Sequence, residues 1–120
     1  MFETNFIQFM KLFSEIPIYS FYIPESAPST AFCFENAGFG CEHFYDYKIE
    51  SRTIKLTLST KNISEIFDDS KLTKYIESTE KVGEIEMLKT RILNFNDNFN
   101  HEQEVYERTY TINFKFKKVH

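Results

Sequence analysis

The sequence of 120 residues contains no tryptophan, two cysteines, and only three glycines and three prolines. Glycine and proline most often interrupt regular structure, so their scarcity excludes collagen-like and linker-rich chains and predicts long helices or strands. Hydrophobic residues make up 42% of the chain and charged residues 27%, which excludes wholesale disorder. This length is that of one domain, and we expect residues 1–120 to form a single domain.

Clustered basic residues are also scarce. The formal net charge is −4, and most Lys and Arg residues alternate with acids. Affinity for a phosphate backbone comes from clustered cations, so the composition disfavours a generic nucleic-acid binder, and we expect no sequence-specific binding of nucleic acid. The one local cluster, Lys115, Lys117 and Lys118, is interpreted as a solvated strand end.

The N-terminal residues lack the basic segment of a secretory signal, and no apolar run approaches the ~20 residues of a membrane span. We therefore expect a soluble chain made in a bacterial cytoplasm, with no membrane partner. Cys33 and Cys41 are then expected as reduced thiols. The two cysteines would face each other if a hairpin joined them, which leaves a disulfide open.

Aromatic residues are abundant: fourteen Phe and seven Tyr make up 18% of the chain. Each aromatic side chain buries about 150–250 Å², so they supply much of a small core. Twenty-one rings exceed what one small core needs. We therefore predict that some lie at the surface, where apolar patches usually contact partners.

The first half of the chain predicts a helix followed by strands. Apolar residues recur at helical spacing over 3–15, and Pro17 ends that helix. A strand over 18–23 precedes a proline loop at 24–28. A second strand, 31–35, is followed by a glycine-containing turn at 36–40 that would need positive φ, and 42–60 has strand character almost throughout, with a long hairpin arm or extended loop at its start.

The second half predicts a helix and two strands. Residues 62–78 fit a helix, with a kink or a break into two helices near Asp69, because its two apolar clusters do not share one face. Residues 84–95 fit either a helix or a strand, and we favour a strand. An Asn-rich loop follows at 94–100. The clearest element is a strand over 104–118, apolar on its even positions except for Glu104 and Arg108.

This order of elements predicts an α+β fold. We expect a mainly antiparallel sheet of about four to six strands, with the N-terminal helix and the central helix packed on one face.

No catalytic, cofactor or metal site is predicted. Cys33, Cys41 and His43 do not have the spacing of a zinc site, and neighbours in sequence are not evidence of a catalytic pair. Asp68 and Asp69 are interpreted as a solvated pair at a helix start. The Asn-rich segment 96–100 lacks the glycine and the final Glu of a calcium loop.

The chain resembles the tail terminator, or tail completion, proteins of long-tailed bacteriophages and phage-tail-like particles, some of which are described as minor capsid or neck proteins. Three features carry the resemblance. The N-terminal helix leads into Ile16-Pro-Ile-Tyr19 and the proline loop. The polar-alternating strand 53–59 runs into an acidic helix. The final strands, 91–95 and 106–117, bracket an Asn/Asp-rich segment.

The resemblance implies a non-enzymatic protein of the virion, assembled as a homo-oligomeric ring, commonly a hexamer. Such a ring caps the tail tube and joins it to the head connector, so its partners are tail tube and head-connector proteins. The alternatives are another phage neck or baseplate adaptor, or a small cytoplasmic binding module with an aromatic cleft. Aromatic residues at positions that offer little core are interface candidates: Phe39, Tyr45, Tyr47 and Phe99.

Overall fold

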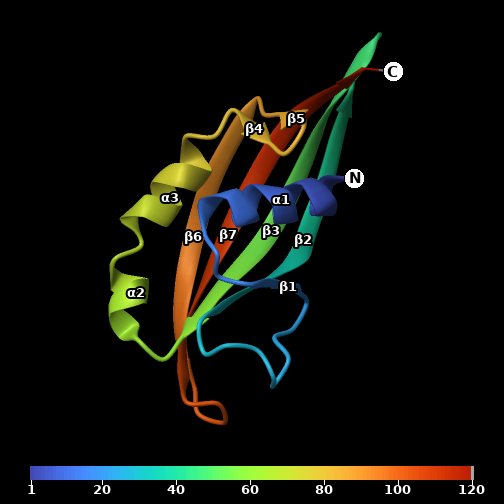
Figure 1. Cartoon of the computed structure of the whole chain (residues 1–120). Helices are drawn as coiled ribbons and strands as arrows, with labels where there is room; N and C mark the ends of the chain where they lie inside the picture. Colours follow the sequence, from blue (N-terminus) through green and yellow to red (C-terminus); the bar gives the residue numbers. More distant parts are fainter. Residues whose placement is uncertain (120) are drawn as a thin grey trace.

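Helix α1 (Phe2–Phe13) lies across one face of a five-stranded sheet (Figure 1). The structure, a computed structural model, describes residues 1–119. One stripe of α1 is buried, namely Phe2, Phe6, Phe9 and Met10. The helix ends at Ser14, which adopts an extended conformation and accepts a hydrogen bond from the Ile16 amide at 3.0 Å. The predicted helix is confirmed, within two residues at each end.

The sheet has the order β1-β2-β3-β7-β6. Its strands are β1 (Ile18–Ser20), β2 (Ala31–His43), β3 (Tyr47–Thr60), β6 (Lys89–Asn100) and β7 (Val105–Val119). Neighbours pair antiparallel, except that β1 runs parallel to β2. Two short helices, α2 (Ile63–Phe67) and α3 (Ser70–Glu77), and a small hairpin of β4 (Lys81–Val82) and β5 (Ile85–Glu86) complete the chain. The predicted α+β fold is confirmed.

The main hydrophobic core lies on one face of the sheet. Even-numbered residues of the central strands face the helices, and each of the following is at most 4% exposed: Ile54, Leu56, Leu58, Tyr110, Ile112, Phe114 and Phe116. The opposite face is polar, with Thr57 and Thr109 hydroxyls 2.8 Å apart and the Asn113 amide donating to Ser51 Oγ at 2.8 Å. Because every buried side chain of Val, Leu, Ile or Phe size contributes about 1.5–3 kcal/mol, this apolar face holds the helices on the sheet.

Strand β2 is longer than the sequence predicts. The expected turn at 36–40 is wrong: β2 continues through both glycines, with a bulge between Asn36 and Gly38. The turn lies instead at 44–46, inside the expected strand 42–60, and divides that segment between β2 and β3. Gly38 lies opposite Thr53, so these glycines are strand residues, and the positive φ expected there is absent. The expected strand 18–23 is also shorter and ends at Ser20.

The expected Asn-rich loop is wrong as well. Residues 94–100 belong to β6, which has a bulge between Ile92 and Asn94. Phe95 and Phe99 pair with Tyr110 and Tyr106 on the helix-covered face, so the asparagines between them lie on the polar face. Residues 95–99 alternate between aromatic and polar side chains, as a strand does. Phe95 and Phe99 gain contacts only from the neighbouring strand β7, which the local sequence does not show. The preference for a strand over residues 84–95 is confirmed for β5 and β6.

The central helix is broken as predicted. Asn62 caps α2, and its side chain accepts a hydrogen bond from the Ser64 amide at 3.1 Å. Helix α3 begins at Ser70, after the break at Asp68–Asp69. Asp69 is not the solvated residue that the sequence predicts. Its carboxylate accepts hydrogen bonds from Arg108 at 3.0 Å and from the Tyr110 hydroxyl at 2.5 Å.

Arg108, which interrupts the apolar positions of β7, is buried and forms four hydrogen bonds. Its guanidinium donates two bonds to Asp97 of β6, at 2.6 and 2.8 Å, one to Asp69 and one to the Ile66 carbonyl of α2 at 3.1 Å. The Phe95 ring lies 4.2 Å from it. A buried guanidinium is tolerated when its donors are satisfied, so Arg108 joins β7, β6 and the α2–α3 break.

These contacts change the acidity of the groups involved. The hydrogen bond from Arg108 lowers the pKa of the Asp97 carboxyl below its ordinary value, and the carboxylates raise the pKa of Arg108. Burial, together with the hydrogen bond to Asp69, raises the pKa of the Tyr110 hydroxyl. All three groups therefore keep their charge states, Asp97 and Arg108 ionised and Tyr110 neutral, throughout the neutral range.

The β4–β5 hairpin packs on α1 through a close backbone contact. Gly83 has a φ of +61°, and a Cβ at that position would lie 2.1 Å from Asn5 Oδ1. The same oxygen accepts a hydrogen bond from the Glu84 backbone amide at 2.8 Å, while the side-chain nitrogen of Asn5 donates to the Met1 carbonyl at 2.8 Å. Asn5 is thus held from both sides, and only glycine fits the turn beside it.

Replacing Asp97 by Asn should reduce the acid sensitivity of the fold. The folded-state pKa of Asp97 is depressed, so its ionisation stabilises the fold above the unfolded-state pKa, and this contribution is lost as the pH falls through the folded-state pKa. We expect the urea midpoint to fall less for Asp97→Asn than for the wild type between about pH 6 and about pH 2.5. Asp46→Asn, in the exposed turn, serves as the control and should behave as the wild type. Equal acid sensitivity of all three proteins would contradict this account.

Gly83→Ala should destabilise the fold by about 1–3 kcal/mol, because alanine is strained at positive φ and its methyl group displaces Asn5. The matched control is Gly38→Ala, where the new Cβ would lie 3.5 Å from Thr53 Cβ at a φ that alanine adopts freely. Urea unfolding measures both variants. A Gly83→Ala protein as stable as the Gly38→Ala protein would show that the contact with α1 is dispensable.

Candidate assembly surface

An arm of β2 and β3, accompanied by the end of β7, extends past α1 (Figure 1). It makes the molecule elongated, 51 Å along its longest axis and 24 and 23 Å along the others. The turn at 44–46 closes the arm, and the Phe44 amide donates to the Tyr47 carbonyl at 2.8 Å across it. The predicted interface residues Tyr45 and Tyr47 lie at this tip.

Three aromatic side chains gather at the tip of the arm. Tyr45 is fully exposed, and Phe44 is 42% exposed. The ring of Tyr47 stacks on Phe44 with centroids 4.7 Å apart, and Lys117 Nζ lies 4.4 Å from its centroid. Tyr47 is therefore held in place, while Tyr45 and Phe44 present apolar surface to solvent with no core beneath them.

Phe39 lies in β2, not at a turn. Phe39 is 62% exposed, and its ring centroid lies 5.1 Å from the Arg52 guanidinium, which is also 5.9 Å from the centroid of the Phe2 ring. Arg52 also pairs with Glu3 of α1 at 3.5 Å. Phe39 thus covers a cation that connects the arm to the first turn of α1.

Phe99 lies at the other end of the sheet. It belongs to β6, packs edge-on against Tyr106 and His101, and is 36% exposed. The length of β3 separates this end from the arm tip, roughly 40 Å at the usual strand rise. The structure therefore brings Tyr45 and Tyr47 together with Phe44, places Phe39 along the same arm, and sets Phe99 apart.

Sequence reasoning missed two exposed aromatic residues after β1. Phe21 and Tyr22 are 71% and 72% exposed. Phe21 has a φ of +70°, and the Tyr22 amide donates to the Ser20 carbonyl at 2.9 Å, which defines a γ-turn centred on an aromatic residue. Residues 18–23 have the composition of a strand, so the sequence predicts that Phe21 and Tyr22 belong to one. Backbone strain at an exposed aromatic residue marks the segment as a further interface candidate.

Both cysteines lie on strand β2, and His43 lies two residues after Cys41. The cysteines are free and eight residues apart on that strand, so the disulfide left open by the sequence cannot join them. Burial, and then Glu35 and Glu107, raises the pKa of the Cys33 thiol, which makes it a poorer nucleophile. Cys41 Sγ lies 3.6 Å from His43 Nε2, on an exposed part of the strand. Residues 1–119 contain no cluster of three or more His, Cys, Asp or Glu side chains suited to a metal ion.

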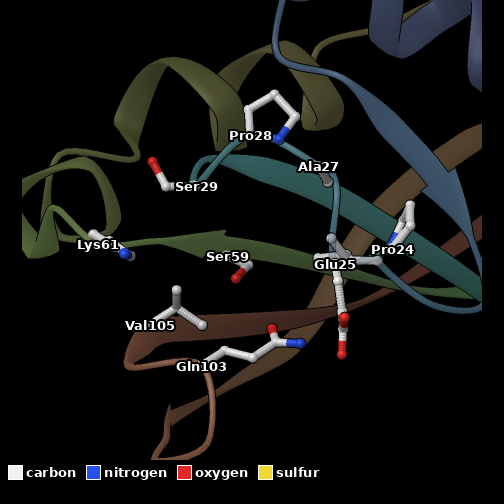
Figure 2. Close-up of a pocket in the computed structure, with 10 residues that line it drawn as sticks. Pro24, Glu25, Ala27, Pro28, Ser29, Ser59, Lys61, Gln103 and Val105 are labelled. Carbon is white, nitrogen blue, oxygen red and sulfur yellow. The ribbon is translucent and has the colours of Figure 1, made fainter.

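The proline loop covers a hollow at the lower end of the sheet (Figure 2). Its volume is about 430 Å³, with Pro24, Glu25 and Pro28 on the loop side and Ser59 and Val105 on the strand side. A second groove, of about 530 Å³, lies between α1 and the α2–α3 pair, with Phe13, Phe32 and Leu72 among its apolar walls. The first hollow is mixed in polarity, because Glu25, Lys61 and Gln103 line it beside the two prolines.

Comparison with known proteins finds a shared fold. No family model matches the chain, and no curated protein matches its sequence. Among solved structures, a chain from the structure described as "Virion of native gene transfer agent (GTA) particle" superimposes with a TM-score of 0.61 at 5% identity, covering 83% of this chain and 78% of that one. The α+β arrangement is therefore one that a virion chain also adopts. Within residues 1–119, no helix has the length and apolarity needed to cross a bilayer.

Phe39→Leu should lower the free energy of unfolding by about 0.5–1 kcal/mol, because it removes the ring from the Arg52 guanidinium. Tyr45→Leu should change the free energy of unfolding by less than about 0.5 kcal/mol, since Tyr45 is fully exposed. Urea denaturation followed by far-UV circular dichroism distinguishes the two. If Tyr45→Leu lowered the free energy of unfolding as much as Phe39→Leu does, the tip of the arm would contribute to folding stability.

Proposed function

We propose that this protein is a non-enzymatic structural component of a bacteriophage-type virion, and that its residues form one folded domain. The shared fold with a chain of the gene transfer agent virion carries the proposal, because the match extends over most of both chains. The finer proposal is a tail terminator, which forms a ring, caps the tail tube and joins it to the head connector, as the sequence resemblance implies.

The exposed aromatic residues support assembly. Aromatic side chains are enriched where protein interfaces are fully buried, and the tip of the arm holds Phe44 and Tyr45 away from any core. An arm that extends from one side of a subunit contacts a different surface on its neighbour, and such head-to-tail contacts close into rings when the rotation permits. The arm is therefore the element that we assign to the contact between subunits.

Two alternatives remain within the same fold. Another neck or baseplate adaptor would use the same aromatic tip on a different partner, without a ring of identical subunits. A small binding module would use the groove between α1 and α2–α3, whose apolar walls include Phe13 and Phe32. An enzyme is the weakest alternative, because the 3.6 Å Cys41–His43 contact lies on an exposed strand, whereas nucleophilic catalysis needs such a pair beside a bound substrate and its oxyanion donors.

The double substitution Phe44→Ser and Tyr45→Ser should impair assembly without unfolding the chain. We expect the wild type to form rings in native mass spectrometry, alone or with the tail tube protein of the same particle. The variant should need at least about tenfold higher concentration, since a buried aromatic contact contributes more than about 1 kcal/mol to an interface. Leu12→Ser, at an 82% exposed position on α1, is the control.

The proposal of a ring would be overturned if the wild type stayed monomeric both at high concentration and in the presence of the tail tube protein. A complex with one partner but no homo-oligomer would support the adaptor instead. Saturable binding of a small apolar ligand, abolished by Leu72→Asp in the groove and unaffected at the arm, would support the binding module.

A further inference from the structure

The polar face of the sheet carries a group of cations that the sequence does not reveal. Lys115 and Lys117 of β7 lie on this face, since their even-numbered neighbours face the helices. The pairing of β6 with β7 sets Lys89 directly opposite Lys115 and Arg91 opposite Asn113. We call these four residues, Lys89, Arg91, Lys115 and Lys117, the cationic track. All four are exposed. Lys118, their neighbour in sequence, lies on the other face and pairs with Glu50 at 3.9 Å.

The charges of the track are not neutralised within the described chain. None of its four residues forms an ion pair with another of residues 1–119. Acids do lie nearby on other elements: Glu84 and Glu86 line the same hollow as Lys117, and Glu77 of α3 accepts a hydrogen bond from the Ile92 amide at 3.4 Å. Like charges placed directly opposite each other on adjacent strands are destabilising, so the Lys89–Lys115 pair is a cost that an external anion relieves.

The track has a regular repeat. Residues two apart on a strand face the same side, so Lys117, the Lys89–Lys115 row and the Arg91–Asn113 row follow one another at roughly 7 Å. Hydrogen-bonding side chains lie beside the cations: Ser51 and Thr53 of β3 are opposite Lys115 and Asn113, and both hydroxyls accept a hydrogen bond from the Asn113 side-chain amide. A nucleic-acid strand likewise carries one negative charge per nucleotide, at a repeat of several ångströms.

We propose that the cationic track binds the phosphate backbone of double-stranded DNA without sequence specificity. Lys and Arg neutralise phosphates, and hydroxyl and amide side chains donate to phosphate oxygens. Single-stranded nucleic acid is a poorer fit, because it needs aromatic rings on which bases stack. Tyr47, the aromatic residue of this face nearest the track, already has Lys117 over its ring. The proposal goes beyond the virion role and depends only on the charge pattern.

Fluorescence anisotropy of a labelled 24-base-pair duplex with the full chain tests the proposal. We expect a dissociation constant of about 10⁻⁴–10⁻⁶ M, independent of base sequence, and a plot of log affinity against log salt with a slope of about −3 to −4, as four phosphate contacts predict. Lys89→Gln with Lys115→Gln should weaken binding at 50 mM salt by about tenfold or more and reduce the slope by about two.

The matched control is Lys71→Gln with Lys74→Gln on α3, which lies among the helices and not on the polar face (Figure 1). Both double variants have a net charge of −6, from −4 less two, so a difference between them reports position and not total charge. No binding by the wild type at 20 mM salt, or equal losses in both variants, would overturn the proposal. Polyglutamate that binds as tightly as duplex DNA at equal charge concentration would assign the track to an acidic protein instead.

Discussion

The packing of α1 on one face of the sheet is the constraint on which the rest of the molecule depends. Phe6 is completely buried between Phe34 and Phe114, with ring centroids 5.2 and 5.7 Å apart. One helix and two short ones provide enough apolar surface to cover a single face. The other face must therefore be polar, and the ends of the long strands extend past the helices into solvent. The arm and the cationic track are both consequences of this one-sided core.

Arg108 extends that core to the edge of the sheet. Its position belongs to the apolar face of β7, where an unpaired charge would be strongly unfavourable. The two bonds to Asp97 hold β6 in register next to its bulge, and the bonds to Asp69 and Ile66 hold the α2–α3 break against the same strand. A single guanidinium thus connects β7 to β6 and to the α2–α3 break, while Tyr75 of α3 stacks on Phe9 of α1 with ring centroids 4.5 Å apart.

The two functions that we propose use different parts of the molecule, the tip of the arm and the polar face of the sheet. The aromatic tip of the arm supplies apolar surface for contacts with other subunits, and the polar face supplies positive charge for a polyanion. A ring built through the arm would present the polar faces of its subunits in a common orientation, because symmetry repeats every surface. The net charge of −4 does not conflict with this, since a local group of cations determines the potential close to it more than the total does.

Local pattern was enough to predict some elements and not others. The helix α1, the strand β7 and the break at Asp69 follow from residue spacing, because each has a period that a single element satisfies. Residue spacing does not predict that the glycines of β2 and the asparagines of β6 belong to strands, because in both cases the strand depends on pairing with its neighbour. Of the predicted interface residues, Tyr45 and Tyr47 meet at one tip, whereas Phe99 lies at the other end of the sheet.

The sequence by itself determined the fold class, the apolar faces and the excess of aromatic residues, since these depend on composition and on periods of 3.6 and two. Only the tertiary structure decided that Arg108 is a buried connection and that Phe21 and Tyr22 are exposed. It also decided that Lys89 and Arg91 lie beside Lys115 and Lys117. These residues are brought together by strand pairing over more than twenty positions, and the register that sets them opposite each other is fixed by the packing of the whole sheet.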